Sequence, residues 1–436
     1  MASSPRSPPS PPPPLEPWVV LGRVARVSYG AVGDSTDPSV ALALPPRVSS
    51  LTVPIGIHPK RSYAGADKHP YVVAATDAGL LLHVSQGPAV GFDLERNPPG
   101  ILVVARDFLP ADAAAAGRDD PTATAVRVPD RAFPPQPGIA NIKHVGFVSL
   151  PGTDEYVIAE LRLLDDPDRA TLLSFRSGTD AWVQRDVLCP NVTGRRWHRP
   201  IDDVVSHDGK IWWVNLVFGL LGWNALADLQ LAVLRHVDLP EVFAIEDKAP
   251  PPEHLEHNRM VRVSHRKVRF VDMTRTRDDP VEETLVVVWT MVFGVAVSWK
   301  QRCLTSLAAI WADESYRMTG MPAQPPVLAL LHPTNPSVVY FFLEQYLFGV
   351  DVHESTVTEF VAEPCNLVEL VAGPVRPPPI SWRYVLAWML PPSLRNALDN
   401  EHSISEELEI QDDEAPTEGC QSSAPSSGLT DRNEST

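Results

Sequence analysis

The stretch from Asp208 to Pro240 constrains the fold of this chain more than any other part of the sequence. It opens with Asp208-Gly209, a turn signal, because glycine adopts positive φ without strain and aspartate bonds back to its own backbone. The β-branched and aromatic run 210–217 that follows is typical of a buried strand. Two glycines then break the run, and a second apolar series covers 229–237 before a proline, which cannot donate to a strand ladder, ends it. This order of elements is typical of one unit of a β-propeller or a β-sandwich.

Further units of the same kind recur along the chain. The 46 prolines outnumber the 24 glycines and are scattered through the sequence, which favours many short elements over long helices. Strands are predicted from β-branched and apolar runs, many of which flank a short turn, and they lie at 18–27, 41–44 and 51–53, at 71–75, 80–84 and 101–105, at 142–150, 156–164, 171–175 and 181–187, at 259–263 and 268–273, at 285–291 and 295–299, and at 338–343, 347–352 and 356–360. The predicted fold class is therefore all-β and mostly antiparallel. Trp182, Trp212 and Trp289 are expected on strands of this body.

Three segments depart from the strand pattern. The stretch 110–137 combines an alanine run with several prolines and is predicted to form a long surface loop. Residues 310–318 are expected to form a short helix. After a last strand at 384–390, the prolines at 391 and 392 can begin a two-turn helix that reaches residue 398.

Composition divides the chain into four parts. Residues 1–16 form a proline-rich leader that is expected to be disordered. Residues 17–194 and 195–392 are predicted to be the N-terminal and C-terminal halves of one β body. Residues 393–436 are expected to hold a short helix and then a disordered acidic tail, because from Asp399 onward eleven acidic residues stand against one arginine. The tail supplies most of the net charge of −17, so the body is only mildly acidic and a general affinity for nucleic acid is disfavoured.

Targeting and membrane signals are weak in this sequence. The leader contains no apolar segment of the kind found in secretory signals. The most apolar run, 285–299, is shorter than the roughly 20 residues that a membrane span needs. The four cysteines lie far apart and form neither a zinc pattern nor a disulfide framework. We therefore expect a protein of the cytoplasm and/or the nucleus that does not bind membranes and is a monomer.

The sequence contains no complete catalytic or metal-binding motif of a common type. His254 and His257 form a lone H-x-x-H pair without the carboxylate or third ligand of a catalytic metal site. The common hydrolase, nucleotide-binding and zincin signatures do not occur. The paired carboxylates Asp202-Asp203 stand beside a histidine and a glycine turn, which favours a role in turns over acid–base chemistry. No catalytic residue, cofactor site or metal site is predicted, and the chain is not expected to be an enzyme.

One hairpin carries a local concentration of positive charge. Between 259 and 277, basic side chains alternate with valines and a phenylalanine, which predicts one apolar and one basic face. The basic face is either a solvated hairpin face or a docking patch for an acidic partner or for the chain's own acidic tail. If it binds a partner, the candidate residues are Arg262, Arg266, Lys267, Arg275 and Arg277.

Three segments give the chain a specific family resemblance. They are HRPIDDVVSHDGKIWWVNLVFGLLGWNALAD at His198 to Asp228, MVRVSHRKVRFVDMT at Met260 to Thr274, and IWADESYRMTGMPAQPPVLALLHPTNPSVVYFFLEQYLFGVDV at Ile310 to Val352. These segments resemble the plant family called domain of unknown function 1618, which is greatly expanded in grasses. The resemblance covers roughly 195–362 and implies no established activity. It implies a β-propeller-like fold similar to the F-box-associated and kelch-type propellers.

Chain length sets the expected number of propeller blades. Blades need about 40 to 50 residues each, so the body can hold eight compact blades or six blades with long loops. We expect about six. The sequence departs from the family pattern at Met291-Val292-Phe293-Gly294, where a polar turn between paired strands is expected, and this departure leaves the register of that hairpin open.

The function expected from these observations is that of a non-catalytic protein-interaction module with an unidentified protein partner. A substrate receptor of a ubiquitin ligase is one form of such a module, although residues 1–60 lack the amphipathic helices of an F-box, so an adaptor would be needed. The alternative is a nuclear regulator that contacts nucleic acid or an acidic partner through the hairpin 259–277. A third hypothesis, an enzyme acting in the central channel of a propeller, requires polar side chains to converge there.

Overall fold

The structure is a computed structural model of the chain. The residues that it describes all lie in the first of two compact units, residues 1–398. They are 17–28, 37–54, 57, 70–77, 79–85, 100–110, 120–131, 141–150, 152–164, 168–190, 201–226, 234–240, 255–275, 279–294, 297–365, 367, 381–395 and 397. The leader and the acidic tail predicted from the sequence lie outside the described residues.

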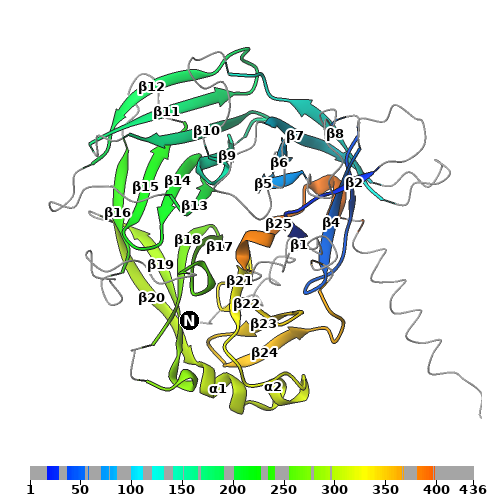
Figure 1. Ribbon diagram of the computed structural model, residues 1–436, viewed down its shortest axis with the longest axis vertical. Coiled ribbons are helices and arrows are strands. Elements are labelled where there is room, and N and C mark those ends of the chain that lie inside the picture. Colours follow the sequence, from blue (N-terminus) through cyan, green and yellow to red (C-terminus); the bar gives the residue numbers. More distant parts are fainter. Residues whose placement is uncertain are drawn as a thin grey trace, which may run out of the picture. The chain divides into compact units, whose positions relative to one another are not determined.

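Four antiparallel sheets of four strands follow one another along the chain (Figure 1). In each sheet the strands are neighbours in the order in which they occur in the sequence, so each sheet is a simple meander. The first two sheets consist of β9 (Val145–Ser149), β10 (Tyr156–Leu163), β11 (Arg169–Arg176) and β12 (Val183–Leu188), and of β13 (Asp203–His207), β14 (Lys210–Asn215), β15 (Gly219–Asn224) and β16 (Arg235–Asp238). The other two consist of β17 (Arg259–Ser264), β18 (Lys267–Thr274), β19 (Leu285–Phe293) and β20 (Val297–Ser306), and of β21 (Val327–Leu331), β22 (Val338–Leu343), β23 (Tyr346–Asp351) and β24 (Thr356–Phe360).

The remaining strands form a nine-stranded sheet that combines both ends of the body. Its order is β25-β1-β4-β3-β8-β7-β6-β5, with β2 paired to β4. The strands are β1 (Trp18–Gly22), β2 (Arg26–Ser28), β3 (Ser39–Ala41), β4 (Val48–Pro54), β5 (Tyr71–Thr76), β6 (Gly79–Ser85), β7 (Gly100–Leu109), β8 (Thr122–Arg127) and β25 (Val385–Met389). A single residue pair, Ser39 with Thr122, joins β3 to β8. The sheet therefore consists of a meander, β5 to β8, and a second group in which β1 pairs antiparallel with β25 and parallel with β4.

The first strand of each meander contacts the first strand of the next. These contacts join β5 to β9, β9 to β13, β13 to β17 and β17 to β21. Strand β21 then contacts β25, and β25 contacts β5, so the series closes on itself. The N-terminal strand β1 takes part in this closure through its pairing with β25 over five residue pairs.

The inner strands β10, β14, β18 and β22 bury both of their faces, which explains why they are nearly continuous apolar runs. On β14 the side chains of Ile211 and Trp213 pack into the core shared with the preceding sheet, β9 to β12. Trp212 and Val214, one residue out of phase, pack into the core shared with the following sheet, β17 to β20. Successive side chains of a strand point to opposite faces, so one sequence run supplies two cores.

Short helical segments lie mainly between the strands. Two helices, α1 (Leu307–Ala312) and α2 (Glu314–Met318), occupy the position where the sequence predicts a short helix. The side chains of Ser306 and Asp313 cap their first turns by accepting hydrogen bonds from backbone N–H groups. No helix in the described part of the chain is long and apolar enough to cross a membrane.

Several expectations from the sequence are wrong in detail. Strand β8 lies inside the segment predicted to be a long loop, and it forms because it extends the meander beside β7. Trp182 lies just before β12 rather than on it, and its indole nitrogen donates a 2.8 Å hydrogen bond to the carbonyl oxygen of Pro129. After β25 the described residues include the 3-10 turn η6 (Pro392–Leu394), and the described residues Arg395 and Ala397 that follow it are helical, so the predicted helix begins as a 3-10 turn. The hairpin of β19 and β20 keeps its register up to the pair Phe293 with Val297, with one irregularity at Val288/Trp289.

The contact between Gly222 and Trp212 tests the cross-strand packing within the sheet of β13 to β16, where the two residues form a pair on β14 and β15. A Cβ atom added at Gly222 lies 2.3 Å from Cζ3 of the Trp212 ring, which is only 2% exposed and has no room to move. We predict that Gly222→Ala lowers the free energy of unfolding by about 1–3 kcal/mol, in the range of other overpacked cores. Urea denaturation followed by circular dichroism measures this change.

The matched control for this prediction is Gly22→Ala. The atoms nearest to a Cβ at Gly22 lie 3.4 Å away or more, which is ordinary van der Waals contact. We expect this variant to lose less than about 1 kcal/mol. Equal losses in the two variants would contradict the close approach of Gly222 to Trp212.

Candidate functional site

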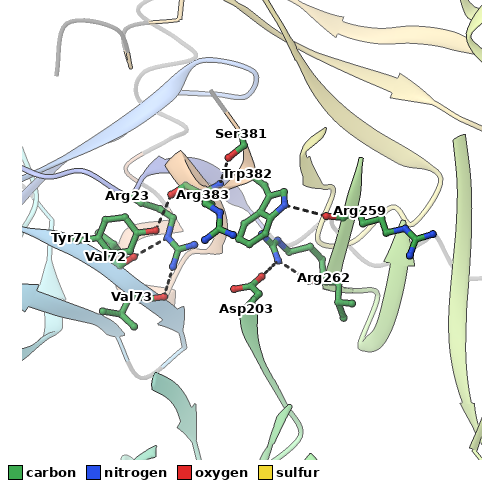
Figure 2. Close-up of polar contacts among 11 residues, drawn as sticks. Arg23, Tyr71, Val72, Val73, Asp203, Arg259, Arg262, Ser381, Trp382 and Arg383 are labelled. Carbon is green, nitrogen blue, oxygen red and sulfur yellow. Dashed lines mark hydrogen bonds and ion pairs between the residues drawn. The ribbon is translucent and has the colours of Figure 1, made fainter. Parts of the chain in front are cut away.

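Six side chains from distant parts of the sequence converge beside the closed series of first strands (Figure 2). We call this group the Trp382 cluster. It contains Arg23 from the turn after β1, Tyr71 at the start of β5, Asp203 at the start of β13, Arg262 from β17, and Trp382 and Arg383 from the 3-10 turn η5 (Trp382–Tyr384) that precedes β25.

Trp382 is the buried core of the cluster. Its side chain is 2% exposed, and its indole nitrogen donates a 3.1 Å hydrogen bond to the carbonyl oxygen of Arg259. The guanidinium carbons of Arg262 and Arg383 lie 4.6 and 4.9 Å from the centre of a Trp382 ring. Cation–π contacts of this kind are each worth about 0.5–2 kcal/mol. Trp382 therefore holds two arginine side chains in fixed positions.

Tyr71 and Arg23 form the second side of the cluster. The Tyr71 hydroxyl donates a 2.8 Å hydrogen bond to the carbonyl oxygen of Arg383. Arg23 lies over the Tyr71 ring at 4.8 Å and donates hydrogen bonds of 2.9 and 2.6 Å to the carbonyl oxygens of Val72 and Val73. Burial raises the pKa of Tyr71, whereas the positive charges of Arg23 and Arg383 oppose this rise.

Arg262 has a carboxylate partner within the cluster. Its Nη1 donates to the Asp203 carboxylate and, at 2.7 Å, to the carbonyl oxygen of Val261. Both side chains of the ion pair are largely buried, at 17% and 13% exposed. The sequence predicts Asp203 as a turn residue, but the structure places it at the start of β13, where it anchors the neighbouring strand β17 through this ion pair.

Two further carboxylates lie near Arg383. Glu256 approaches Nε of Arg383 at 3.9 Å, a distance at the outer limit of an ion pair. Asp202 accepts a 2.8 Å hydrogen bond from the backbone N–H of Leu216. Burial raises the pKa of Asp202, and the charge of Arg383 acts in the opposite direction. The cluster thus combines three guanidinium groups with one ion-paired carboxylate, Asp203, and has two further carboxylates beside it.

The chemistry that this arrangement supports is binding through guanidinium donors. Arginine presents planar N–H donors that match carboxylate and phosphate oxygens. The described residues contain no group of three or more histidine, cysteine, aspartate or glutamate side chains that could hold a metal ion.

The residues predicted to bind a partner lie in two separate environments. Arg262 is bound within the Trp382 cluster. Arg266 and Lys267 are exposed at the turn between β17 and β18, and Arg275 is exposed at the other end of β18. Arg277 lies outside the described residues.

The hairpin of β17 and β18 does not present the continuous basic face that its alternation predicts. Arg259 is buried and forms an ion pair with Asp272. Arg269 is 3% exposed and donates a hydrogen bond to the side chain of Thr290. Burial raises the pKa of Asp272 to about 6, and its hydrogen bonds with Arg259 act against this rise. These two arginines stabilise the sheet, so the exposed positive charge is confined to the ends of β18.

Sequence reasoning missed most of the Trp382 cluster. Arg23, Tyr71, Trp382 and Arg383 stand in no motif, and segments at opposite ends of the sequence supply them. The available signal was Ser381 directly before Trp382 and Arg383, because serine is a common cap of helical turns and its side chain accepts a hydrogen bond from the backbone N–H of Arg383. Only the closure of the sheets brings these residues together.

Comparison with protein families identifies a match to part of the chain. Residues 213–340 match the model of a family described as a protein of unknown function (DUF1618). The matched range runs from within β14 to within β22 and includes Arg262, but it includes no other member of the Trp382 cluster. No curated protein matches the chain.

A double-mutant cycle tests the ion pair of the cluster. Asp203→Asn leaves the largely buried Arg262 guanidinium without its carboxylate, so we predict a loss of about 1–3 kcal/mol in the free energy of unfolding, less than for fully buried pairs because both groups keep some exposure. In an Arg262→Gln background the same substitution should cost at least about 0.5 kcal/mol less, because the charge that Asp203 neutralises is gone. Urea denaturation of the four proteins measures the coupling, and strictly additive losses would show that the two side chains do not interact.

Proposed function

We propose that this chain is a six-bladed β-propeller that acts as a non-catalytic protein-interaction module. The four meanders, β5 to β8, and the group β25, β1, β4 and β3 would be the six blades. The closed series of contacts between first strands supports this arrangement. In such a propeller the pairing of β1 with β25 joins the two ends of the chain in one blade, and the blades form a rigid support for binding surfaces.

The surface that supports the interaction role lies where three hairpins end close together. We call it the tip surface and define it as Lys210, Leu226, Arg266, Lys267, Val292 and Phe293. The Nζ atom of Lys210 lies 5.6 Å from the centre of the Phe293 ring. Leu226 lies against Gly209, the residue before Lys210. His207, at the same turn, makes a hydrogen bond with the backbone of Arg266.

The observation that carries the proposal is the exposure of apolar side chains on this surface. Leu226 is 50% exposed, Phe293 is 52% exposed and Val292 is 40% exposed, although most large apolar side chains of the described residues are buried. Exposed aromatic side chains next to cations are typical of protein-binding hot spots. Phe293 is one residue of the segment where the family pattern predicts a polar turn.

The charge of the tip surface indicates the kind of partner. Lys210, Arg266 and Lys267 are basic, and Asp208, which lies 3.5 Å from Lys210, offsets only part of their charge. We infer that the partner is a protein segment with acidic and apolar side chains. A substrate-receptor role in a ubiquitin ligase is one form of this function.

Selection of displayed peptides against the full chain tests the proposal. We expect the selected peptides to combine acidic and apolar residues and to bind Phe293→Ser, or the double variant Arg266→Glu with Lys267→Glu, at least about tenfold more weakly than the wild type. Met318→Ser is the matched control, because Met318 is 81% exposed and lies on α2, outside the tip surface. All variants should keep the wild-type melting temperature, since the changed side chains are exposed.

The outcomes of this experiment separate the functions considered. Peptides that bind the wild type and Phe293→Ser equally well would contradict a role of the tip surface in partner binding. Binding of labelled RNA or DNA that falls steeply with salt and is lost in the double charge variant, but not in Phe293→Ser, would favour the nucleic-acid alternative.

A further inference from the structure

The three arginine side chains of the Trp382 cluster differ in how many of their N–H donors have an acceptor. Arg262 is held by Asp203 and by a backbone carbonyl group. Arg23 uses Nε and Nη2 on the carbonyl oxygens of Val72 and Val73, and among the described residues no carboxylate lies within ion-pair distance of it. Arg383 is the least satisfied of the three.

The guanidinium group of Arg383 makes no hydrogen bond to any described residue. Its Nε atom is buried without an acceptor, and the Glu256 carboxylate at 3.9 Å is too far away for a hydrogen bond. The whole side chain is only 16% exposed. Buried polar groups in proteins nearly always have a hydrogen-bond partner, so donors left open in this way indicate an acceptor that the described residues do not supply.

Arg383 is nevertheless held in a fixed position. Its guanidinium carbon lies 4.9 Å from the centre of a Trp382 ring, and its carbonyl oxygen accepts the hydrogen bond of Tyr71. Arg23 lies over the ring of the same Tyr71, and Figure 2 shows both guanidinium groups in the space between Tyr71 and Trp382. Tyr71 and Trp382 thus hold the guanidinium groups of Arg23 and Arg383 beside one another. Two cations fixed in this way form a preorganised anion site, because a bound anion relieves the repulsion between them.

We propose that Arg383 and Arg23 bind an oxyanion, either a carboxylate or a phosphate group, beside Trp382. The planar fork of Arg383 supplies two parallel N–H donors, the geometry that carboxylate and phosphate oxygens match. The remaining nitrogen of Arg23, Nη1, has no hydrogen bond to the described residues and supplies a third donor. This site goes beyond the proposed interaction function, because it uses none of the residues of the tip surface.

Isothermal titration and thermal melting of the full chain test the site with two probes. Inorganic phosphate and succinate are each titrated at constant ionic strength against chloride. We expect saturable binding of at least one probe, with a dissociation constant of about 1 mM or lower, and a matching rise in the melting temperature. Saturation by phosphate alone identifies a phosphoryl ligand, saturation by succinate alone identifies a carboxylate ligand, and saturation by both identifies a general oxyanion site.

Substitutions at the two arginines locate the binding. Arg383→Gln should abolish saturation, and Arg23→Gln should weaken binding at least about tenfold. Arg383→Lys keeps the charge but loses the planar fork, so it should bind with intermediate strength, and it serves as the second variant if Arg383→Gln does not fold. Arg176→Gln is the matched control, because Arg176 is about half exposed and is paired with Glu155 on the surface.

Two results would overturn the proposal. One is the lack of saturable binding of either probe up to about 50 mM, far above the concentration at which such a site fills. The other is equal affinity in the wild type, Arg383→Gln and Arg383→Lys. The test of the anion site is independent of the tip surface, whether or not that surface binds peptides. Phe293→Ser should therefore bind phosphate or succinate like the wild type.

Discussion

The antiparallel pairing of β1 with β25 is the interaction on which the rest of this structure depends. Five residue pairs join the first described strand of the chain to the last one. Val19, Val20 and Leu21 of β1 are fully buried, and Trp388 of β25 packs against Phe108 with ring centres 5.0 Å apart. Without this pairing β25 would lose the strand to which it is hydrogen-bonded within the described part of the chain, and two strands would expose edges that promote association.

The same closure builds the candidate site. Trp382 and Arg383 lie in the 3-10 turn directly before β25, and Arg23 follows directly after β1, so the pairing of the two strands brings these side chains together. The nitrogen of Trp382 reaches β17, and Tyr71 reaches Arg383 from β5. A substitution that breaks the pairing of β1 with β25 should therefore disturb the Trp382 cluster first. The tip surface depends on neighbouring hairpins of β13 to β19, so it should be less sensitive.

Local pattern in the sequence predicts the strand pairs that are joined by short turns, as in β5 with β6 and β17 with β18. It misses β13 and β21, both of which belong to the closed series of first strands, and it misses β15, which contains the two glycines predicted to interrupt a strand. β13 begins at the second of two aspartates and contains a serine and a histidine, so its composition resembles a turn, and only its position between β14 and β17 makes it a strand. β21 follows a proline-rich linker that conceals its beginning. Contacts across the whole chain determine these elements, and short windows of sequence do not contain that information.

The predicted site residues show the same limit. The alternation in 259–277 correctly indicates a hairpin rich in cations, but it cannot distinguish Arg266, which is exposed, from Arg269, which is buried against Thr290. Which cation finds an internal partner depends on strands that lie far away in the sequence, as Asp203 does for Arg262. The partner, the cellular location and the role of the acidic tail stay predictions from the sequence.

Hydrogen exchange measured by mass spectrometry tests the closure most directly. If β1 and β25 are paired, the amides of 18–22 and 385–389 should be protected to the same degree, and their protection should approach that of the central strands β10 and β14, because they open only with the whole body. The two segments should also lose protection together as urea is added. Fast exchange of either segment while β10 and β14 stay protected would contradict the account, because it would show that the body is stable without joining its two ends.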